Sequence, residues 1–500
     1  MNRLALACSV LAWCAIAGAN GRPPASSTIT FQQGNPQHIV AGMTFGVLVS
    51  SDGGRTWSWI CEAAFPYAGV YDPDMLDTES GALFATTFKG LKVMRDGCSF
   101  GAVSLANGHC DGPKSDPCYA NVFLSKVVAG GGSAMYATAS SPYDSRIYRS
   151  ADDGHTFDVL SSPGDADEYW QSFAIAPSNP KRIYLAGYRF TTQCDAHSTN
   201  AGSACRLNSN CTGSGTGSAM PKCTTVKTFS LFRSDDAGAT WSSLSQANLP
   251  MSQSSAITIV GIDPADANQV YVHVSAESGG TGDAVYKSAN GGSSAWTKVF
   301  ETKDPSGLVM LVRSNGGLIA ATETSGAFSS AGGSACVDQS SCKWTRLANA
   351  PHINCLVEQP DNKDIWACTR NYGNGSNIAS DGAGIMKTSD LATWTPMLKY
   401  ADIAGPVSCG SDKSPAQQCV VPNDGRPSVW CCLVDQLGIK STAVACTGAY
   451  ACTEGAEPPS RKASSTPAKH GGCCDAGGGS EPGALLLGAL TLLCISRRRC

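Results

Sequence analysis

The sequence predicts an all-β protein: a seven-bladed β-propeller of four-stranded antiparallel blades over residues 27–400, followed by a small disulfide-rich segment. Two observations predict this fold. A short turn that ends in an aromatic residue, with an aspartate in most copies, recurs seven times along these residues. Two apolar segments joined by another turn precede each copy, and most copies lie about 45 to 50 residues apart. Four strands repeated at this interval are typical of propeller blades.

The first repeat shows the order of elements within one unit. Residues 28–31, 39–43, 47–50 and 56–60 are short apolar segments separated by turn residues, and we expect each to form a strand. The recurring turn lies between the third and the fourth strand. Each unit therefore consists of strand, turn, strand, loop, strand, acidic turn and strand.

The recurring turn is clearest at residues 51–57, where Asp52 precedes two glycines and Trp57 ends the segment. We expect the carboxylate to accept hydrogen bonds from backbone N–H groups and the aromatic ring to pack back between two sheets. Glycine supplies the positive φ that such a turn needs. Further copies occur at residues 150–157, 234–241, 288–296 and 389–394, and degenerate copies end at Phe100 and Trp344.

This turn resembles the Asp-box (BNR) repeat of sialidases, sortilin-type receptors, xyloglucanases and related propellers. The resemblance implies that the turn residues are structural, because in these propellers the turn lies on the face away from the usual ligand site. The residues given this structural role are Asp52, Trp57, Asp152, Phe157, Asp236, Trp241, Trp296, Asp390 and Trp394.

Composition excludes several classes of protein. Charged residues make up 15% of the chain, against roughly 25% in an average soluble domain. The net charge of −4 provides no basic field for nucleic acid. The 24 cysteines favour an oxidising compartment over a reducing cytosol. The chain therefore does not match a cytosolic nucleotide enzyme, and it contains no apolar run of the length that a polytopic membrane protein needs.

The first 19 residues predict a secretory signal peptide. A single positive charge at Arg3 precedes an apolar segment over residues 4–16, and small residues up to Ala19 form the cleavage site. A lipoprotein signal would place its lipidated residue at Cys14, but Trp13 is too bulky for the position before it. Export as a soluble protein is therefore the preferred interpretation.

The last 48 residues predict a stalk and a sorting signal. Residues 453–472 are small, polar and contain prolines, which is typical of a flexible stalk. Residues 473–500 contain a cysteine pair, a short apolar helix and an arginine cluster, and they resemble the C-terminal sorting signal of myxobacterial surface proteins. The residues concerned are Cys473, Cys474, Arg497, Arg498 and Arg499. An ordinary weak tail anchor is the alternative.

Eighteen cysteines remain outside the predicted signal peptide and tail, and most lie in local clusters. An even number of this kind predicts disulfides. We expect Cys61 to bridge to Cys98 across the first two blades, and Cys355 to bridge to Cys368 on adjacent strands. Residues 401–452 are too few for a large core and are expected to form a disulfide-held module.

Catalytic signals are weak in this sequence. The Phe/Tyr-Arg-Ile-Pro signature that the resemblance to sialidases implies is absent. Two carboxylates flanking a sugar bond suffice for other glycosidases, and the candidates are Asp72 with Asp74, or a second group in the fourth unit. That second group consists of Asp165, Asp167 and Glu168, beside the aromatic residues Tyr169 and Trp170. Short acidic loops of this kind are more often solvated turns.

Candidate ligand-binding residues lie near one loop of the fourth unit, with weaker candidates, Arg370 and Tyr372, in the last unit. About 35 extra residues stand between Phe190 and Thr228, and four cysteines can order them before a ligand binds. We expect this loop on the face opposite the acidic turns. The candidate binding residues are Tyr169, Trp170, Tyr188, Arg370 and Tyr372.

Two functions of different class follow from these observations. The first is an exported, cell-surface propeller that binds an extracellular protein or glycan without catalysis. The second is a secreted glycoside hydrolase, sialidase-like or xyloglucanase-like. Neither requires a cofactor, and the seven histidines show no metal-ligand spacing. Further expected partners are the export and C-terminal sorting machinery, with membrane contact only through the tail and none with nucleic acid.

Overall fold

The computed structural model describes most of the chain between residues 23 and 446. The described ranges are 23–65, 72–88, 90–103, 124–140, 145–164, 168–213, 220–252, 255–275, 282–303, 307–373, 379–413, 415–421 and 428–446. The predicted signal peptide, stalk and sorting signal lie outside these ranges, and so do Asp165 and Asp167.

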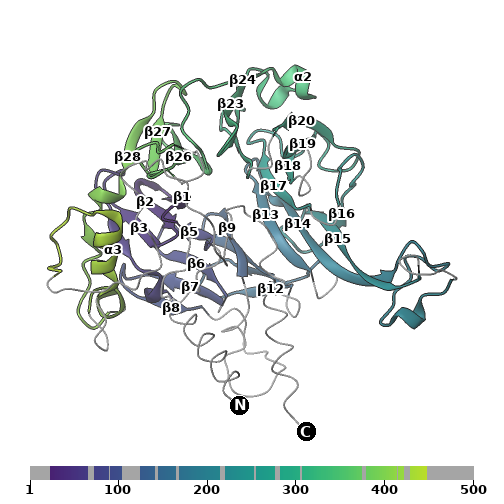
Figure 1. Ribbon diagram of the computed structural model, residues 1–500, viewed down its shortest axis with the longest axis horizontal. Coiled ribbons are helices and arrows are strands. Elements are labelled where there is room, and N and C mark those ends of the chain that lie inside the picture. The colour runs from purple at the N-terminus through teal and green to yellow at the C-terminus, as the bar shows by residue number, and fades with distance from the viewer. Residues whose placement is uncertain are drawn as a thin grey trace, which may run out of the picture. The chain divides into compact units, whose positions relative to one another are not determined.

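Seven sheets of four antiparallel strands form a ring, which confirms the predicted fold (Figure 1). Blade one consists of β1 (Ser26–Gln32), β2 (Asn35–Met43), β3 (Gly46–Ser50) and β4 (Ser58–Ile60). Blade two consists of β5 (Met75–Asp77), β6 (Leu83–Thr87), β7 (Gly90–Met94) and β8 (Phe100–Ala102), and blade three of β9 (Leu124–Gly131), β10 (Ala134–Ala139), β11 (Ile147–Ser150) and β12 (Asp158–Leu160).

The remaining blades repeat this order. Blade four consists of β13 (Tyr169–Ala176), β14 (Asn179–Cys194), β15 (Cys223–Ser234) and β16 (Ser242–Ser243), and blade five of β17 (Ile257–Ile262), β18 (Val270–Val274), β19 (Ala284–Ser288) and β20 (Thr297–Glu301). Blade six consists of β21 (Val309–Val312), β22 (Leu318–Thr322), β23 (Gly326–Ser330) and β24 (Trp344–Arg346), and blade seven of β25 (Cys355–Glu358), β26 (Ile365–Cys368), β27 (Ile385–Thr388) and β28 (Thr395–Leu398).

The first strand of each blade lies at the centre of the ring, since the first strands of successive blades contact one another around the whole circle. The second strands are buried on both faces by the neighbouring blades. β6 and β22, for example, are buried at every position. These strands are therefore continuous apolar or small-residue runs, whereas the outermost strands are short and largely exposed, as in β12.

The tryptophan of the recurring turn fastens its blade to the preceding one. The indole N–H groups of four such residues donate to a backbone carbonyl at the outer edge of the preceding blade. These pairs are Trp57 to Met397 at 3.0 Å, Trp241 to Ser161 at 2.9 Å, Trp296 to Ser245 at 2.7 Å and Trp344 to Val299 at 2.6 Å. One hydrogen-bond geometry thus recurs between blades around the ring.

The contact between Trp57 and Met397 also closes the ring, because it joins blade one to blade seven. Phe31 meets Trp366 of blade seven edge to face, with ring centroids 5.6 Å apart. Gly54 has a φ of +83°, and a Cβ there would lie 2.7 Å from the Trp366 ring. Glycine is therefore needed at this turn both for its backbone conformation and for the approach of the neighbouring blade.

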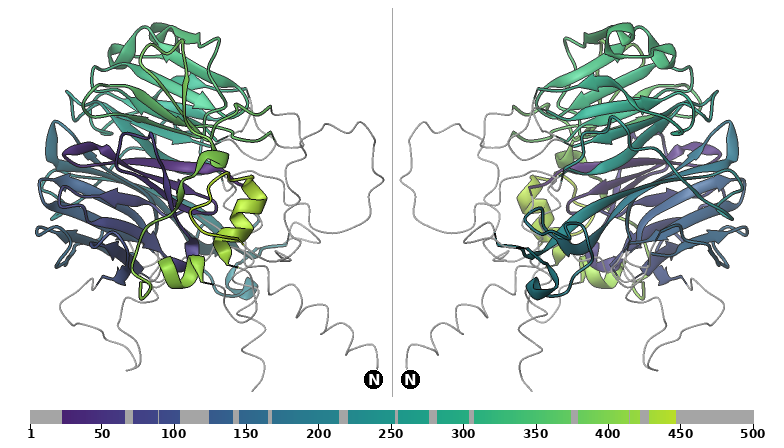
Figure 2. Two further views of the ribbon diagram at one scale, coloured as in Figure 1. Left: turned by 90° about the vertical axis from the view of Figure 1, so that its left-hand side faces the viewer. Right: turned by 90° about the vertical axis from the view of Figure 1, so that its right-hand side faces the viewer.

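A C-terminal clasp, residues 405–446, covers the outer edge of blade one (Figure 2). After η5 (Tyr400–Asp402), β29 (Gly405–Pro406) pairs in parallel with β4 and adds a fifth strand to that sheet. Two short helices follow, η6 (Ala416–Val420) and α3 (Val429–Leu437). Trp430 of α3 is fully buried against Trp59 of blade one, with ring centroids 5.5 Å apart.

Two disulfides tie the clasp to the ring. Cys61, after β4, is bonded to Cys419, and Cys98 of blade two is bonded to Cys409. The predicted bridge between Cys61 and Cys98 is therefore wrong. Proximity along the sequence suggested that pair, but the ring brings the end of the chain back to its beginning and supplies nearer partners.

The other bridges are local. Cys355 and Cys368 are bonded across adjacent strands of blade seven, which confirms the prediction. The remaining pairs are Cys194–Cys211, Cys205–Cys223, Cys336–Cys342 and Cys431–Cys446. The two bridges that join the clasp to blades one and two show that the cysteine-rich segment packs on the propeller. The seven disulfides between described cysteines indicate an exported protein, since such bridges persist in oxidising compartments. Among the described residues, no helix is long and apolar enough to cross a membrane.

The remaining short helices lie in loops. They are η1 (Glu62–Ala64) after blade one, η2 (Asn208–Asn210) in the insertion of blade four, and η4 (Gly333–Ala335) with α2 (Gln339–Cys342) in blade six. The two helices in blade six accompany the bridge between Cys336 and Cys342. None of them interrupts a blade.

Replacing Trp57, which is 2% exposed, should strongly destabilise the ring. Trp57→Ala is expected to lower the free energy of unfolding by roughly 3 to 5 kcal/mol. Trp57→Phe, which removes the N–H donor and part of the ring but keeps an aromatic side chain, should lower it by a smaller amount. Trp241→Ala should cost less, because Trp241 is partly exposed. Denaturant unfolding followed by far-ultraviolet circular dichroism measures all three. Equal losses for the two alanine variants would contradict a special role for ring closure.

Removing a clasp disulfide should cost more than removing a local one. The pair Cys61 and Cys419 closes a loop with a sequence separation of 358, whereas Cys336 and Cys342 are separated by 6. All four side chains are buried, which makes the two double serine variants comparable. The chain-entropy model expects the clasp variant to lose roughly 2 to 4 kcal/mol more. Thermal unfolding under non-reducing conditions tests the difference.

Candidate functional site

The two ends of the ring carry different kinds of connection. The recurring turns and the turns between first and second strands lie at one end, which we call the turn face. The connections between second and third strands and those between blades lie at the other end, which we call the hairpin face. This follows from the antiparallel order of strands within each sheet.

On the turn face, each aspartate of the recurring turn is occupied by the turn itself. Asp152 Oδ1 accepts hydrogen bonds from the Ser150 hydroxyl at 2.8 Å and the Thr156 backbone N–H at 2.9 Å, and its Oδ2 accepts from the Thr156 hydroxyl at 2.6 Å. Asp52 and Asp236 make the same three kinds of contact. The carboxylates therefore hold the turn.

These hydrogen bonds favour the charged form of the carboxyl groups. The side-chain and backbone hydrogen bonds from Thr156 lower the pKa of Asp152 to about 2, and those from Thr240 lower the pKa of Asp236 to about 2. In Asp390, the backbone N–H groups of Thr393 and Ala392 lower the pKa to about 2. Such groups stabilise the folded state while they are ionised.

On the hairpin face, several carboxylates join neighbouring blades. Asp74 lies before β5 of blade two, 3.3 Å from the ammonium of Lys126 in blade three, and it accepts the Val127 backbone N–H at 2.9 Å. Asp283 of blade five lies 3.1 Å from His273 and accepts the Leu308 backbone N–H of blade six. Each of these two carboxylates is already engaged by partners within the ring.

Glu168 lies in a buried polar contact within blade four. The Ser230 hydroxyl donates to its carboxylate at 2.9 Å, and the Arg189 guanidinium lies 4.0 Å away. The side chain is 2% exposed. Trp170 is also buried, at 1% exposed, and its indole donates to the Ser145 carbonyl at 2.7 Å. Both residues therefore pack inside the blade, and the Trp170 ring offers no open face for a sugar.

Tyr169 and Tyr188 lie on the other side of the same blade, because side chains alternate along a strand. Their rings are stacked at 5.2 Å with an interplanar angle of 8°. Phe190, 47% exposed, meets both rings edge to face at 5.9 and 5.4 Å. We call Tyr169, Tyr188 and Phe190 the aromatic ledge. The strand alternation separates it from Glu168, although the two are adjacent in sequence.

Lys227 supports the ledge from the neighbouring strand β15. Its ammonium lies 4.2 Å from the centroid of the Tyr188 ring and donates to the Ser255 carbonyl at 2.5 Å. Burial lowers the pKa of Lys227, and burial raises the pKa of Tyr188 to about 12. Phe190 and Lys227 were not among the residues expected from the sequence. The alternation of Tyr188 with Phe190 and of Lys227 with Phe229 was the signal that could have identified them.

Arg370 and Tyr372 of blade seven have packing roles. Arg370 forms an ion pair with Glu323 of blade six, and its backbone N–H donates to Asp381 at 2.9 Å. The Tyr372 hydroxyl donates to the Leu437 carbonyl of the clasp at 2.7 Å. The structure brings neither residue into the ledge.

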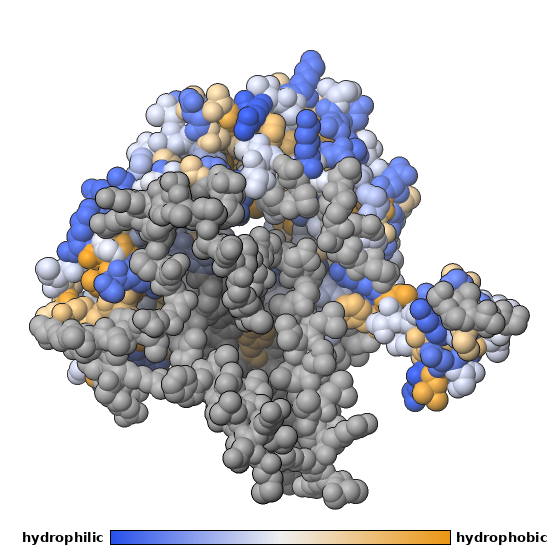
Figure 3. All heavy atoms as spheres, viewed as in Figure 1, coloured by the Kyte–Doolittle hydropathy of each residue, from blue (hydrophilic) through white to orange (hydrophobic). Residues whose placement is uncertain are grey.

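The insertion of blade four is a long hairpin that projects from the ring (Figure 1). β14 and β15 stay paired as far as Cys194 and Cys223, and two disulfides hold the residues beyond them. The three cysteine sulfurs nearest one another are thus bonded in disulfides and are not free thiolates. Phe190, Leu207 and Met220 expose 47, 66 and 56% of their surface, and apolar atoms are visible on the projection in Figure 3.

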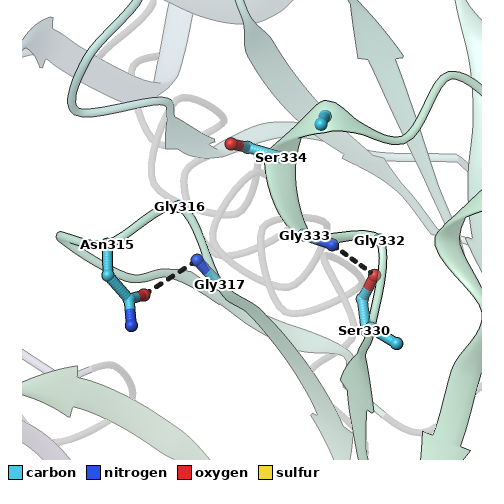
Figure 4. A pocket seen from close by; sticks show the side chains of 9 residues that line it. Asn315, Gly316, Gly317, Ser330, Gly332, Gly333 and Ser334 are labelled. Carbon is cyan, nitrogen blue, oxygen red and sulfur yellow. Dashed lines mark hydrogen bonds between the residues drawn. The ribbon is translucent and has the colours of Figure 1, made fainter.

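Two shallow hollows of the described surface lie away from the ledge. One of about 320 Å³ is formed by residues 315–317 and 330–335 on the turn face of blade six. Figure 4 shows that polar groups in its lining pair with one another, with Asn315 accepting from Gly317 and Ser330 from Gly333. Another, of about 450 Å³, lies between residues 401–404 and 440–443. Neither lining contains an aromatic side chain.

Comparison with known proteins gives distant propeller neighbours. The sequence matches no known protein family and no curated protein. An ancestral GH74 enzyme has a TM-score of 0.41 at 12% identity, over 75% of this chain and 49% of that one. YCF48 from Cyanidioschyzon merolae has a TM-score of 0.37 at 13% identity, over 75 and 86%. The GH74 xyloglucanase from Xanthomonas campestris has a TM-score of 0.31 at 12% identity, over 77 and 66%. This chain thus spans about half of the ancestral enzyme.

The low pKa of Asp152 predicts a change of stability in acid. Because the pKa is lower in the folded protein than the ordinary value of 3.8, the contribution of Asp152 is complete above about pH 4 and is lost as the pH falls towards 2. Asp152→Asn should therefore be less stable than the parent at neutral pH, with the difference shrinking between pH 4 and 2. Urea unfolding across this range measures it.

Asp158→Asn provides the matched control for this comparison. Asp158 is an exposed aspartate in the adjacent strand β12, and its replacement should leave the stability profile unchanged. A constant difference between Asp152→Asn and the parent from pH 7 to pH 2 would contradict the role assigned to the carboxylate.

Proposed function

We propose that the protein is an exported, cell-surface propeller that binds an extracellular protein or glycan through its hairpin face and does not transform it chemically. The observation that carries this proposal is the disulfide-held hairpin of blade four. It exposes three large apolar side chains, and the aromatic ledge lies at its base. Exposed apolar groups gathered on one projection favour an interaction surface.

The hairpin is suited to binding because much of its order exists before any ligand arrives. β14 and β15 pair continuously from Ile183 to Cys194, and the bridges Cys194–Cys211 and Cys205–Cys223 restrict the segment between them. Ordering before association reduces the conformational entropy that binding must overcome. Loops on a rigid scaffold are common positions for recognition.

The alternative, a glycoside hydrolase, needs two carboxyl groups facing a sugar across about 5 to 10 Å. Glu168 is buried and accepts a hydrogen bond from the Ser230 hydroxyl, and Asp74 forms an ion pair with Lys126. These engagements support binding over hydrolysis. Asp165 and Asp167 lie outside the described residues, so the experiment below includes a measurement of hydrolysis.

The proposed location rests on the two ends of the sequence. The signal peptide over residues 1–19 supports export, and the likeness of residues 473–500 to a myxobacterial sorting signal supports retention at the cell surface. The Asp-box resemblance agrees with an extracellular propeller. Membrane contact then occurs only through the tail, and the export and sorting machinery are transient partners.

The proposal predicts that binding depends on the hairpin and occurs without turnover. The full chain and a variant with a short Gly-Ser linker in place of residues 193–224 are compared on arrayed glycans and arrayed extracellular proteins, with parallel assays for released reducing sugar. We expect saturable binding by the full chain, loss of it in the variant, and no sugar release.

Two controls accompany this comparison. Thermal unfolding verifies that the variant keeps the ring. Val337→Ala removes a side chain of blade six with the same 66% exposure as Leu207, and it should leave binding unchanged. Release of reducing sugar by the full chain, or unchanged binding after the hairpin is replaced, would overturn the proposal.

A further inference from the structure

We propose that the aromatic ledge of blade four is a binding site for an uncharged oligosaccharide. This inference rests on the binding function proposed above and adds the class of ligand and the residues that contact it. Phe190 and Tyr169 supply the open aromatic surface. Tyr188 lies between Tyr169 and Lys227 and holds that surface in place.

The exposed surface of the ledge has the chemistry that a sugar ring requires. Phe190 is 47% exposed and Tyr169 is partly exposed, whereas Tyr188 is only 2% exposed. The face of an aromatic ring is electron-rich, and the C–H groups on one side of a pyranose ring are weakly positive. Stacking of one upon the other also removes apolar surface from water. An isolated exposed aromatic residue is ordinary, but here two contact each other at the base of the hairpin.

The ledge is rigid before a ligand binds. β13 and β15 flank β14, so Tyr169 and Lys227 meet the Tyr188 ring from opposite sides. The tyrosine stack is nearly parallel at 8°, and the ammonium of Lys227 is held by the Ser255 carbonyl at 2.5 Å. Phe190 then meets both tyrosines edge to face, at 73° and 76°. Rigid aromatic side chains lose little conformational entropy when they are covered.

Three charged residues that the structure describes near the ledge, Glu168, Arg189 and Lys227, are turned away from it or buried. Glu168 and Arg189 lie on the opposite side of the blade. There the Ser230 hydroxyl donates to the Glu168 carboxylate, and the Arg189 guanidinium lies 4.0 Å from that carboxylate. The Lys227 side chain is 7% exposed and bonded to Ser255. No charge of either sign among these residues is presented beside Phe190, which argues against an acidic peptide, a phosphate or a nucleic acid as the ligand.

Two threonine hydroxyl groups lie on the same face of the hairpin as the ledge. Thr192 and Thr225 are paired across the two strands, two residues beyond the pair formed by Phe190 and Lys227, and both are exposed. Because side chains alternate along a strand, these threonines lie on the side of the ledge. An aromatic surface next to hydroxyl donors and acceptors fits a ligand that presents C–H faces and hydroxyl edges in turn. An oligosaccharide has this character.

Isothermal titration calorimetry with the full chain tests the inference. The probes are cellohexaose, xylohexaose and maltohexaose, which are uncharged and differ in linkage or sugar, and hexagalacturonate, which is charged. The parent should bind at least one uncharged probe in preference to hexagalacturonate. Phe190→Ala should weaken that binding at least tenfold, and Phe190→Tyr, which keeps an aromatic face, should retain it.

Val337→Ala is the matched control, since Val337 is an exposed apolar side chain of blade six, away from the ledge, and its loss should not change the affinity. Thermal unfolding of each variant verifies the fold. Binding of none of the uncharged probes at millimolar concentration, binding of the charged probe alone, or equal affinities for the parent and Phe190→Ala would each overturn the inference. If arrayed proteins still bind through the hairpin, the proposed function stands and only the ligand class is wrong. Because the ledge lies outside residues 193–224, unchanged binding after their replacement overturns the proposed function, whereas equal affinities for the parent and Phe190→Ala overturn the ligand class.

Discussion

Closure of the ring is the constraint on which the rest of the structure depends. Blade one takes its four strands from residues 26–60, and blade seven takes its four from residues 355–398. The two blades therefore meet through side chains rather than through a shared sheet. The Trp57 indole donates to Met397, and Phe31 packs against Trp366. The clasp then covers the outer edge of blade one with β29, Trp430 and the bridge from Cys61 to Cys419.

Different contacts stabilise the ring on its two faces. On the turn face, the recurring carboxylates hold several of the turns, and four tryptophans of these turns donate to a carbonyl of the preceding blade. On the hairpin face, Asp74 and Asp283 join successive blades. Carboxylates committed to such contacts are poor candidates for chemistry, because any substrate would have to compete with partners already held at hydrogen-bond distance. The contacts that close the ring do not include the hairpin of blade four.

Strand alternation shapes the candidate site in the same blade. Glu168, Tyr169 and Trp170 are consecutive, yet the tyrosine lies on one side of the sheet and the other two on the opposite side. Burial follows from this placement: Glu168 and Trp170 each lie at about 1% exposed, while Tyr169 reaches the surface beside Phe190. Glu168 and Trp170 are therefore packed within the blade, whereas Tyr169 lies at its surface.

The sequence by itself determined the repeated part of this protein. The spacing of the turns predicted seven four-stranded blades, and the local pair Cys355 and Cys368 followed from adjacent strands. Local hydrogen bonding and strand alternation act over a few residues, so the chain order carries that information. Contacts between residues that are far apart in the sequence were decided only by the tertiary structure. The partners of Cys61 and Cys98 and the attachment of Tyr372 to the clasp depend on where the ring brings its ends together. The period of the repeat does not encode those contacts, because each is made once, between elements that only the closed ring makes neighbours.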